Sequence, residues 1–217
     1  MAVRHLYLVR HAQREPTVGP HALGPGLTLL GWKQAHLTAH RLATLKIDVI
    51  HTSSLRRTME TARIIALEFE GIPIRPSSLL WECIPAIPDY AMEWHRKHEN
   101  VDTGSIKIPA VMKPWVDLWG EGTTLKEMEE GFEQDRAAWE KYFAPAQGKD
   151  RHDIIVCHGN LMRYFVMRAL MAPSEGWCNA NLYNCGISEI DVNNDGTITL
   201  MSHNDNGHLP DEMKTLT

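Results

Sequence analysis

Cysteine is scarce in this chain of 217 residues, and its few copies are not arranged as ligand pairs. None of them forms a CxxC pair, which is the usual start of a cysteine-based zinc site. The four are Cys83, Cys157, Cys178 and Cys185. Scattered cysteines are typical of a reducing compartment, and no apolar secretory leader precedes the first predicted strand. We therefore expect a cytoplasmic protein, or a soluble organellar form whose targeting segment is missing.

A basic surface and a long apolar segment are also absent. The formal net charge is -5, whereas affinity for a nucleic-acid backbone needs a basic surface. No apolar run approaches the roughly 20 residues that a membrane-spanning helix requires. The composition, 43% hydrophobic and 23% charged, is that of a globular protein with a real core. We predict no nucleic-acid partner and no membrane association, and leave open whether the chain forms a homo-oligomer.

The residues that can carry chemistry begin at the first predicted strand. An apolar run from Leu6 to Val9 ends in Arg10 and His11, which predicts a buried strand with a cation and an imidazole at its carboxyl end. Open α/β sheets place their active sites at that end. A guanidinium suits phosphate oxygens, and an imidazole is a nucleophile or base near pH 7. Alone, such a pair is more often made of ordinary turn residues, so residues elsewhere must decide.

The same pattern of strand, histidine and turn returns late in the chain. Residues 153–157 form an apolar run that ends in His158 and Gly159, before a helix with an apolar face. Two strands that each deliver a histidine can place both imidazoles over one edge of the same sheet. Cys157 beside His158 raises the question of zinc, but no partner pair at ligand spacing accompanies it. We predict no metal.

Arg57 lies near the start of a helix predicted for residues 55–69. A cation there opposes the helix dipole unless an anion sits between the two. Arg57 is therefore a candidate phosphate ligand, although a solvated helix arginine is an equally good interpretation of Arg57 alone.

Glu82 follows a strand predicted for residues 74–80 and adjoins Trp81. Burial against an aromatic ring can raise the pKa of a carboxyl group enough for it to donate a proton near neutral pH. A lone acid after a strand is more often a solvated loop residue. Glu15 and Asp89 are competing candidates for the same role.

The order of the predicted elements indicates an α/β protein. Further helices are expected from Thr28 for about eighteen residues and from Thr123 or Thr124 to about Phe143, and residues 187–192 and 197–202 should form a hairpin at a sheet edge. Between residues 84 and 122 the periodicity weakens among prolines and tryptophans. We predict one domain over residues 1–217, with an insertion at about 84–122 that forms a lid, a substrate pocket or a satellite core.

With these residues in place, the chain resembles the histidine phosphatase superfamily, also called the phosphoglycerate mutase-like family. The resemblance spans nearly the whole chain through four motifs in the right order. They are LVRHA at 8–12, LTLLG at 27–31 with Gln34 and Ala35, SSLRRTMETA at 53–62 and VCHG at 156–159. Within the family, residues 10–13, 176–177 and 206–210 resemble the phosphoglycerate mutase-like protein serine/threonine phosphatases.

The resemblance implies a three-layer α/β/α sandwich with a mostly parallel sheet, and a phosphatase that needs no metal or other cofactor. His11 would become phosphohistidine while Arg10, Arg57 and His158 surround the phosphoryl group. Glu82 would protonate the leaving oxygen and then activate water. The physics agrees, because fixed positive charge stabilises a transferring phosphoryl group and an acid avoids expulsion of an alkoxide. The substrate would be a phosphorylated small molecule or a phosphoprotein, with phosphoserine and phosphothreonine proteins as one class.

Two alternatives stay open. A phosphoglycerate mutase would rephosphorylate its product, although residues 13–16 do not resemble the mutase continuation. A catalytically weak adaptor would keep the phosphate pocket for binding alone. The family usually has glycine where this chain has Ala12, and alanine disfavours a left-handed backbone there by roughly 1 kcal/mol.

Overall fold

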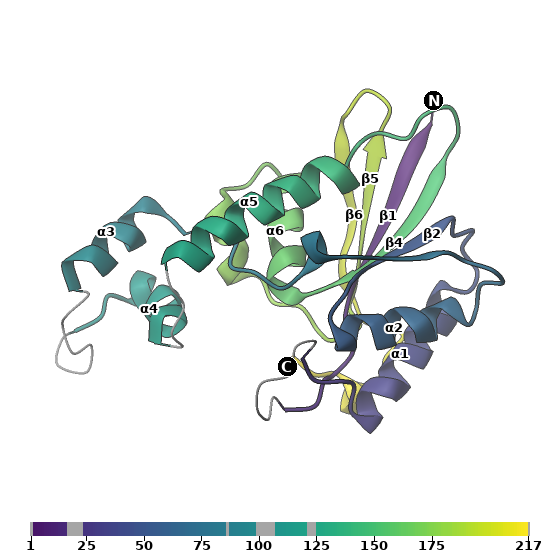
Figure 1. Cartoon of the computed structure of the whole chain (residues 1–217), viewed down its shortest axis with the longest axis horizontal. Coiled ribbons are helices and arrows are strands. Elements are labelled where there is room, and N and C mark those ends of the chain that lie inside the picture. Colours follow the sequence, from purple (N-terminus) through teal and green to yellow (C-terminus); the bar gives the residue numbers. More distant parts are fainter. Residues whose placement is uncertain (1, 17–23, 86, 99–106, 121–124, 217) are drawn as a thin grey trace.

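The computed structural model describes residues 2–16, 24–85, 87–98, 107–120 and 125–216. Its centre is a six-stranded sheet in the order β3-β2-β4-β1-β5-β6 (Figure 1). The strands are β1 (Val3–Arg10), β2 (Val49–Ser53), β3 (Ile74–Ser77), β4 (Arg151–Cys157), β5 (Ile187–Asn193) and β6 (Ile198–Asp205). The first four pair in parallel, and β5 and β6 add an antiparallel hairpin at one edge. The predictions of a mostly parallel sheet and of the edge hairpin are confirmed.

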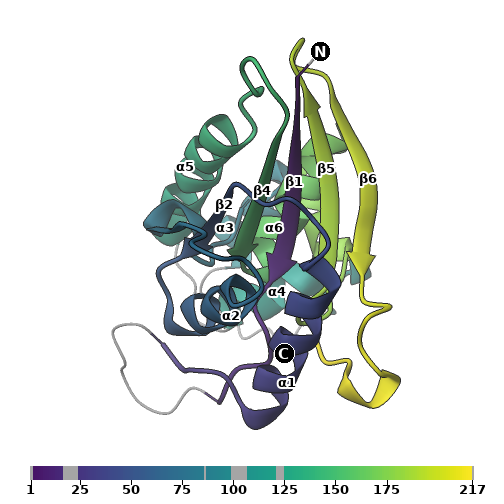
Figure 2. The same cartoon turned by 90° about the vertical axis from the view of Figure 1, so that its right-hand side faces the viewer.

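Helices cover both faces of the sheet. Helices α1 (Leu29–Leu42) and α2 (Arg56–Ala66) pack on one face, and α5 (Leu125–Tyr142) and α6 (Gly159–Ala169) pack on the other (Figures 1 and 2). Alternation along β1 sends Tyr7 and Val9 into the first of these cores and Leu6 and Leu8 into the second. The predicted three-layer α/β/α sandwich is therefore confirmed.

Helix α1 begins with the N-cap that its sequence predicts. Oγ1 of Thr28 accepts a hydrogen bond from the backbone N–H of Gly31 at 2.9 Å, which is an N-cap. Glycine is required at position 31, because a Cβ there would lie 2.1 Å from the carbonyl oxygen of Gln13. The chain that leaves β1 thus packs directly on the start of α1.

Several element boundaries differ from the sequence analysis. The first helix ends at Leu42, after 14 residues instead of about eighteen. The third strand ends at Ser77 instead of continuing to residue 80, because residues Ser78–Leu80 turn into a 3₁₀ helix whose first turn Ser77 caps through its side chain. The second helix ends at Ala66, short of residue 69. The predicted caps Thr123 and Thr124 lie outside the described residues.

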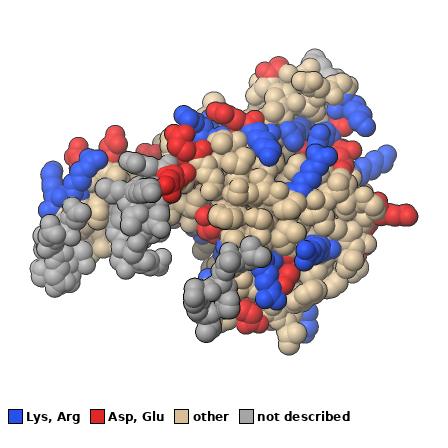
Figure 3. Space-filling view, in the orientation of Figure 1, with Lys and Arg blue, Asp and Glu red and all other residues tan. Residues whose placement is uncertain are grey.

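Described residues between Leu80 and α5 form an arm beside the sheet, at the left of Figures 1 and 3. It contains α3 (Asp89–His98), a 3₁₀ turn (Ala110–Met112) and α4 (Lys113–Gly120). A separate cluster holds it together, in which Trp115 meets Trp177 edge to face at 6.1 Å between ring centroids. Trp177 belongs to a 3₁₀ helix (Ser174–Asn179) that follows α6, so the arm is tied to the main body there. Among the described helices, none is long and apolar enough to cross a membrane.

Candidate active site

Two histidines leave the sheet side by side. Strands β1 and β4 are parallel neighbours that pair Arg10 with Cys157, so the next residues of both strands emerge together. The N–H of His11 donates to the carbonyl of Cys157 at 3.0 Å, and the rings of His11 and His158 lie 5.3 Å apart between centroids. Both side chains are buried. The register of two strands therefore brings together imidazoles that are far apart in sequence.

His11 is held in one tautomer. Its Nδ1 lies 2.8 Å from the carbonyl oxygen of Ala12, and because a carbonyl only accepts, Nδ1 carries the hydrogen and Nε2 keeps a free lone pair. Burial, then the charges of Arg57 and Arg10, keep the pKa of His11 well below its usual value. The imidazole is thus neutral at physiological pH, which a nucleophile requires.

The backbone around His11 is fixed by two side chains. Nδ2 of Asn184 donates to the carbonyl of His11 at 3.0 Å, and the N–H of Ala12 donates to Oγ1 of Thr61 at 3.1 Å. Non-glycine residues of the described part that have a positive φ are confined to Met171, Cys185 and Asn204. Ala12 is not one of them, so alanine fits this position without the left-handed strain that glycine would relieve.

Two arginines border the histidines and retain unused donors. Arg10 donates from Nη1 to the carbonyl oxygens of Leu182 and Leu216, and Arg57 donates from Nη2 to Nδ1 of His158 at 2.9 Å. The Nε atoms of Arg10 and Arg57 are buried and have no hydrogen-bond partner among the described residues. Burial lowers the pKa of Arg10 to about 10, so it stays cationic at neutral pH. Unpaired donors on two buried cations are what an anion would satisfy.

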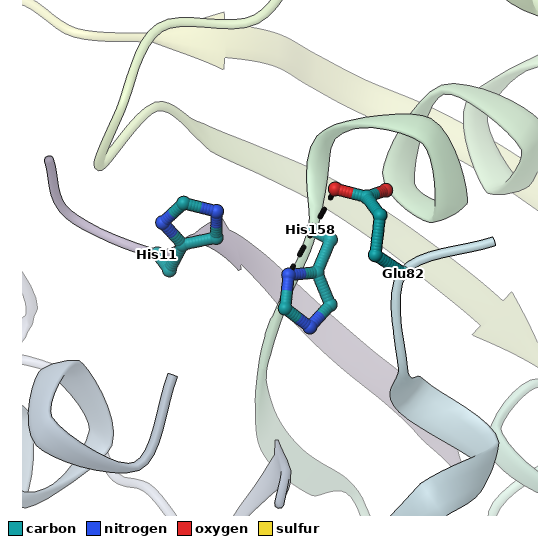
Figure 4. A group of neighbouring side chains, drawn as sticks. All are labelled: His11, Glu82 and His158. Atoms are coloured by element: carbon teal, nitrogen blue, oxygen red, sulfur yellow. Dashed lines mark ion pairs between the residues drawn. The ribbon is translucent and has the colours of Figure 1, made fainter. Parts of the chain in front are cut away.

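Glu82 faces the two histidines from the loop after β3 (Figure 4). Its Oε1 accepts the backbone N–H of Asn160 at 3.0 Å at the start of α6, and its Oε2 lies 3.9 Å from Nδ1 of His158. The side chain is 35% exposed, so solvent and a substrate can reach it. Burial raises the pKa of Glu82, and the Asn160 bond, then Arg57 and Arg10, oppose that rise. Neighbouring Trp81 donates from Nε1 to Oγ of Ser54 at 2.7 Å, which anchors the loop to the turn before α2.

The same three residues are the ones that could hold a metal here. Donor atoms of His11, Glu82 and His158 lie within 4.8 Å of one another, a spacing that a metal ion could bridge after small movements. However, burial lowers the pKa of both imidazoles, and the charges of the guanidinium groups of Arg57 and Arg10 lower it further. Fixed cations repel a metal ion as strongly as they attract a phosphate, so the site is electrostatically suited to an anion.

The structure brings together all five residues singled out from the sequence, namely Arg10, His11, Arg57, Glu82 and His158. It also adds residues that sequence reasoning missed. Arg163 donates to the side chains of Asn160 and Asn181, and its charge acts on both Glu82 and Arg10. The sequence signal for Arg163 was its position one turn into the helix that follows His158. No feature of the sequence pointed to Asn184, because it lies 173 residues from His11, whose carbonyl accepts its hydrogen bond.

The family model of the histidine phosphatase superfamily (branch 1) matches residues 6–206. The chain belongs to the histidine phosphatase superfamily. The serine/threonine-protein phosphatases PGAM5, mitochondrial, of Rattus norvegicus and Homo sapiens are each 32% identical to it over 219 residues. Those matches cover 99% of this chain and 67% and 66% of the relatives, so the chain spans about two thirds of their length.

Solved structures agree with this histidine phosphatase assignment. Phosphoglycerate mutase from Plasmodium falciparum matches with a TM-score of 0.59 and 25% identity, over 97% of this chain and 96% of that one. YhfR of Bacillus stearothermophilus matches with a TM-score of 0.68 at 20% identity, over 94% and 98%. The second likeness shows the fold alone. Family and relatives together make this chain a phosphatase, a phosphoric monoester hydrolase.

The expectation of a cytoplasmic location is wrong. The curated relatives are named as mitochondrial proteins, in mammals and in Caenorhabditis briggsae alike. The scattered cysteines bear on the redox state of a compartment and do not identify which compartment it is.

Proposed function

We propose that this phosphatase hydrolyses phosphomonoesters through a phosphohistidine at His11. The observation that carries the proposal is the Nδ1–H of His11 bonded to the carbonyl of Ala12, which leaves a neutral, unprotonated Nε2. One ring nitrogen of His11 is directed toward His158 and Glu82 in Figure 4. Nε2 attacks phosphorus, the bond to the leaving oxygen breaks, and the carboxyl proton of Glu82 passes to that oxygen.

The second half of the reaction reverses the role of Glu82. The carboxylate takes a proton from water, the oxygen of that water attacks phosphorus, and the bond to His11 breaks to release phosphate. Arg10 and Arg57 supply the positive charge that the transferring group needs, through Nε donors that have no hydrogen-bond partner in the described part of the chain. We propose on this ground that turnover needs no metal ion.

His158 completes the phosphate pocket once an anion arrives. In the structure its Nδ1 accepts from Arg57 and its Nε2 donates to Oγ of Ser53 at 2.9 Å. It can donate to a phosphoryl oxygen only after Nδ1 gains a proton. Burial, and then the charges of His11, Arg57 and Arg10, lower the pKa of His158. The negative charge of the substrate favours protonation because it offsets the repulsion from the two arginines.

Phosphoserine and phosphothreonine proteins are the substrates we propose, and the names of the relatives support this class and a mitochondrial location. Glu82 is partly exposed, as is Trp81, so the mouth of the site can admit a side chain carried on a protein. We also propose that residues 84–122 form an insertion within one domain spanning 1–217, and that this insertion borders the substrate.

The test is release of phosphate from phosphoserine and phosphothreonine peptides by the wild type and by His11→Ala, with His40→Ala as a matched control. We expect His11→Ala to lose more than nine tenths of the rate, and His40→Ala, which changes an exposed histidine on α1, to lose none. Quenching in alkaline detergent should trap a phosphoenzyme in the wild type that is stable in base and is lost on acid treatment, as a phosphohistidine is. A tenth of the wild-type rate in His11→Ala would remove His11 from this role.

Two competing activities are separated in the same experiment. A mutase would convert one phosphoglycerate isomer into another without net release of phosphate, and a coupled assay detects that conversion. An adaptor would bind phosphopeptides without turnover. Either result would replace phosphoprotein hydrolysis as the function.

A further inference from the structure

A second group of metal-ligating side chains lies at the amino end of β1, away from the active site. His5 stands two residues before Tyr7, on the face of β1 that packs toward α1 and α2. In the antiparallel pairing with β5, His5 faces Asp191 and Tyr7 faces Glu189. The register therefore gathers His5, Glu189 and Asp191 on one face, although His5 and Asp191 are 186 residues apart in sequence.

The geometry of this group is close to that of a metal site. Donor atoms of His5, Glu189 and Asp191 all lie within 4.8 Å of one another, and Nδ1 of His5 is 2.7 Å from Oδ1 of Asp191. The side chains of His5 and Asp191 are 23% and 19% exposed, so they are constrained by packing and still reachable. In Figure 2, α1 and α2 stand in front of the lower part of the sheet, and on this face no described helix covers the upper halves of β1 and β5.

The surroundings of this group are negatively charged. Asp48 and Asp150 accept the backbone N–H groups of His152 and Val3, and their charges act on His152, whose ring stacks on His5. Burial, then the charges of Glu189 and Asp191, raise the pKa of Tyr7 to about 12. The charge of Arg41 acts in the opposite direction. Arg41 also pairs with Asp205 at 3.4 Å, so its charge is shared. A cation placed here would be stabilised, in contrast to one placed among the arginines of the active site.

His152 packs against this group through His5 and is not a ligand. Its ring stacks on His5 with 4.4 Å between centroids and 17° between planes. Two rings in nearly parallel planes cannot both direct a nitrogen lone pair at one ion. Three protein ligands therefore remain, with a position left for water.

We propose that His5, Glu189 and Asp191 bind a divalent ion of the zinc class. One imidazole and two carboxylates suit zinc better than magnesium or calcium, which prefer oxygen ligands alone. Bonds of about 2.0–2.2 Å around a tetrahedral ion hold donor atoms about 3.3 Å apart, so rotations of the three side chains suffice to close the site. Catalytic His11 lies six residues further along the chain, roughly 20 Å at the rise of a strand, so this ion takes no part in hydrolysis.

Calorimetric titration of the chelator-treated full chain with Zn²⁺ tests the proposal. We expect about one equivalent to bind, with affinity at least tenfold weaker in His5→Gln and in Asp191→Asn. His40→Gln is the matched control, because His40 also sits beside a carboxylate, Glu68 at 3.3 Å, and belongs to no such three-residue group among the residues that the structure describes. His11→Ala tests the other candidate group. Undiminished binding in both His5→Gln and Asp191→Asn, loss of binding in His11→Ala, or no binding by the wild type would overturn the proposal.

A measurement on the wild type covers the case in which a variant fails to fold. Co²⁺ substituted for Zn²⁺ is paramagnetic, and we expect it to broaden or shift the NMR signals of the His5 and His152 rings while those of His11 and His158 stay in place. The ion should also raise Tm by a few degrees, since it binds the folded state alone. Perturbation of the His11 and His158 signals instead would place the ion in the active site and refute this assignment.

Discussion

The guanidinium of Arg57 donates from Nη2 to Nδ1 of His158 at 2.9 Å. Arginine can only donate, so this contact makes Nδ1 an acceptor and leaves Nε2 to donate to Ser53. In this state His158 offers no free N–H to a phosphoryl oxygen. Arg57 therefore controls the protonation of His158 as well as contributing its own charge, and an arriving anion changes both.

Loss of Arg57 should be costly for this reason. We predict that Arg57→Ala lowers kcat/KM by about 10²-fold or more, because the variant loses charge-assisted contacts and the partner of His158. Arg63→Ala is the matched control, since Arg63 is exposed on the same helix. Steady-state kinetics on a phosphoserine peptide make the comparison. Equal rates in the two variants would mean that Arg57 is a solvated helix residue.

Replacement of Glu82 should affect leaving groups differently. If its carboxyl donates the proton to the leaving oxygen, Glu82→Gln will slow a phosphoserine peptide far more than p-nitrophenyl phosphate, whose nitrophenolate departs without a proton. Rates for both substrates in wild type and variant decide the matter. Equal slowing of the two substrates, or none, would assign the proton donor elsewhere, with Glu15 and Asp89 as the next candidates.

The pH dependence of His11 and Glu82, the two groups for which we propose catalytic roles, should follow their pKa shifts. The pKa of His11 is depressed, so the ring should stay neutral and nucleophilic as the pH falls through about 6.5, the usual imidazole value. NMR titration of the ring, with its signal assigned by comparison with His11→Ala, checks this. The pKa of Glu82 is raised, so kcat/KM for a phosphoserine peptide should fall on the alkaline side as the carboxyl ionises. Persistence of that alkaline limb in Glu82→Gln, or protonation of His11 near pH 6.5, would contradict the assignment.

Stability should depend on Asp135, a buried residue of α5 that lies behind the site. Burial raises its pKa to about 7 from 3.8, and Sγ of Cys83 donates to its Oδ1. A raised carboxyl pKa means that the folded state holds the proton more tightly, so stability falls as the pH rises from about 4 to 7 and is then level. Asp135→Asn removes this loss, and we predict that it stabilises the protein by about 2–4 kcal/mol at pH 8 and much less at pH 4.

Urea unfolding of wild type and Asp135→Asn at the two pH values measures the difference. Asp211→Asn is the control, because Asp211 is exposed and pairs with Lys214 at the surface. A stabilisation by Asp135→Asn that is the same at pH 4 and pH 8 would show that Asp135 does not titrate between them.

Local patterns in the sequence were sufficient for much of the fold and for the core of the site. Apolar runs that stop at Arg10 and at His158 mark strand ends, and the carboxyl ends of neighbouring parallel strands meet at one edge of a sheet. The side chain of Thr28 caps the next helix as expected. The third strand was predicted to be too long, because Leu79 and Leu80 continue an apolar run. In the structure, Ser77 ends the strand and caps a 3₁₀ turn.

By itself, the sequence determined the kind of chemistry: two histidines, two arginines and an acid at strand ends and at a helix start, in the order of one family. The tertiary structure decided the protonation and the tautomer of these groups. Whether Nε2 of His11 is free and which nitrogen of His158 carries hydrogen depend on contacts with Ala12, Arg57 and Ser53, and the grouping of His5 with Asp191 depends on a pairing across 186 residues. The physical reason is the distance along the sequence over which each interaction acts. Periodicity and capping act within a few residues of the chain, whereas hydrogen bonds and strand register are set by which distant segments pack together.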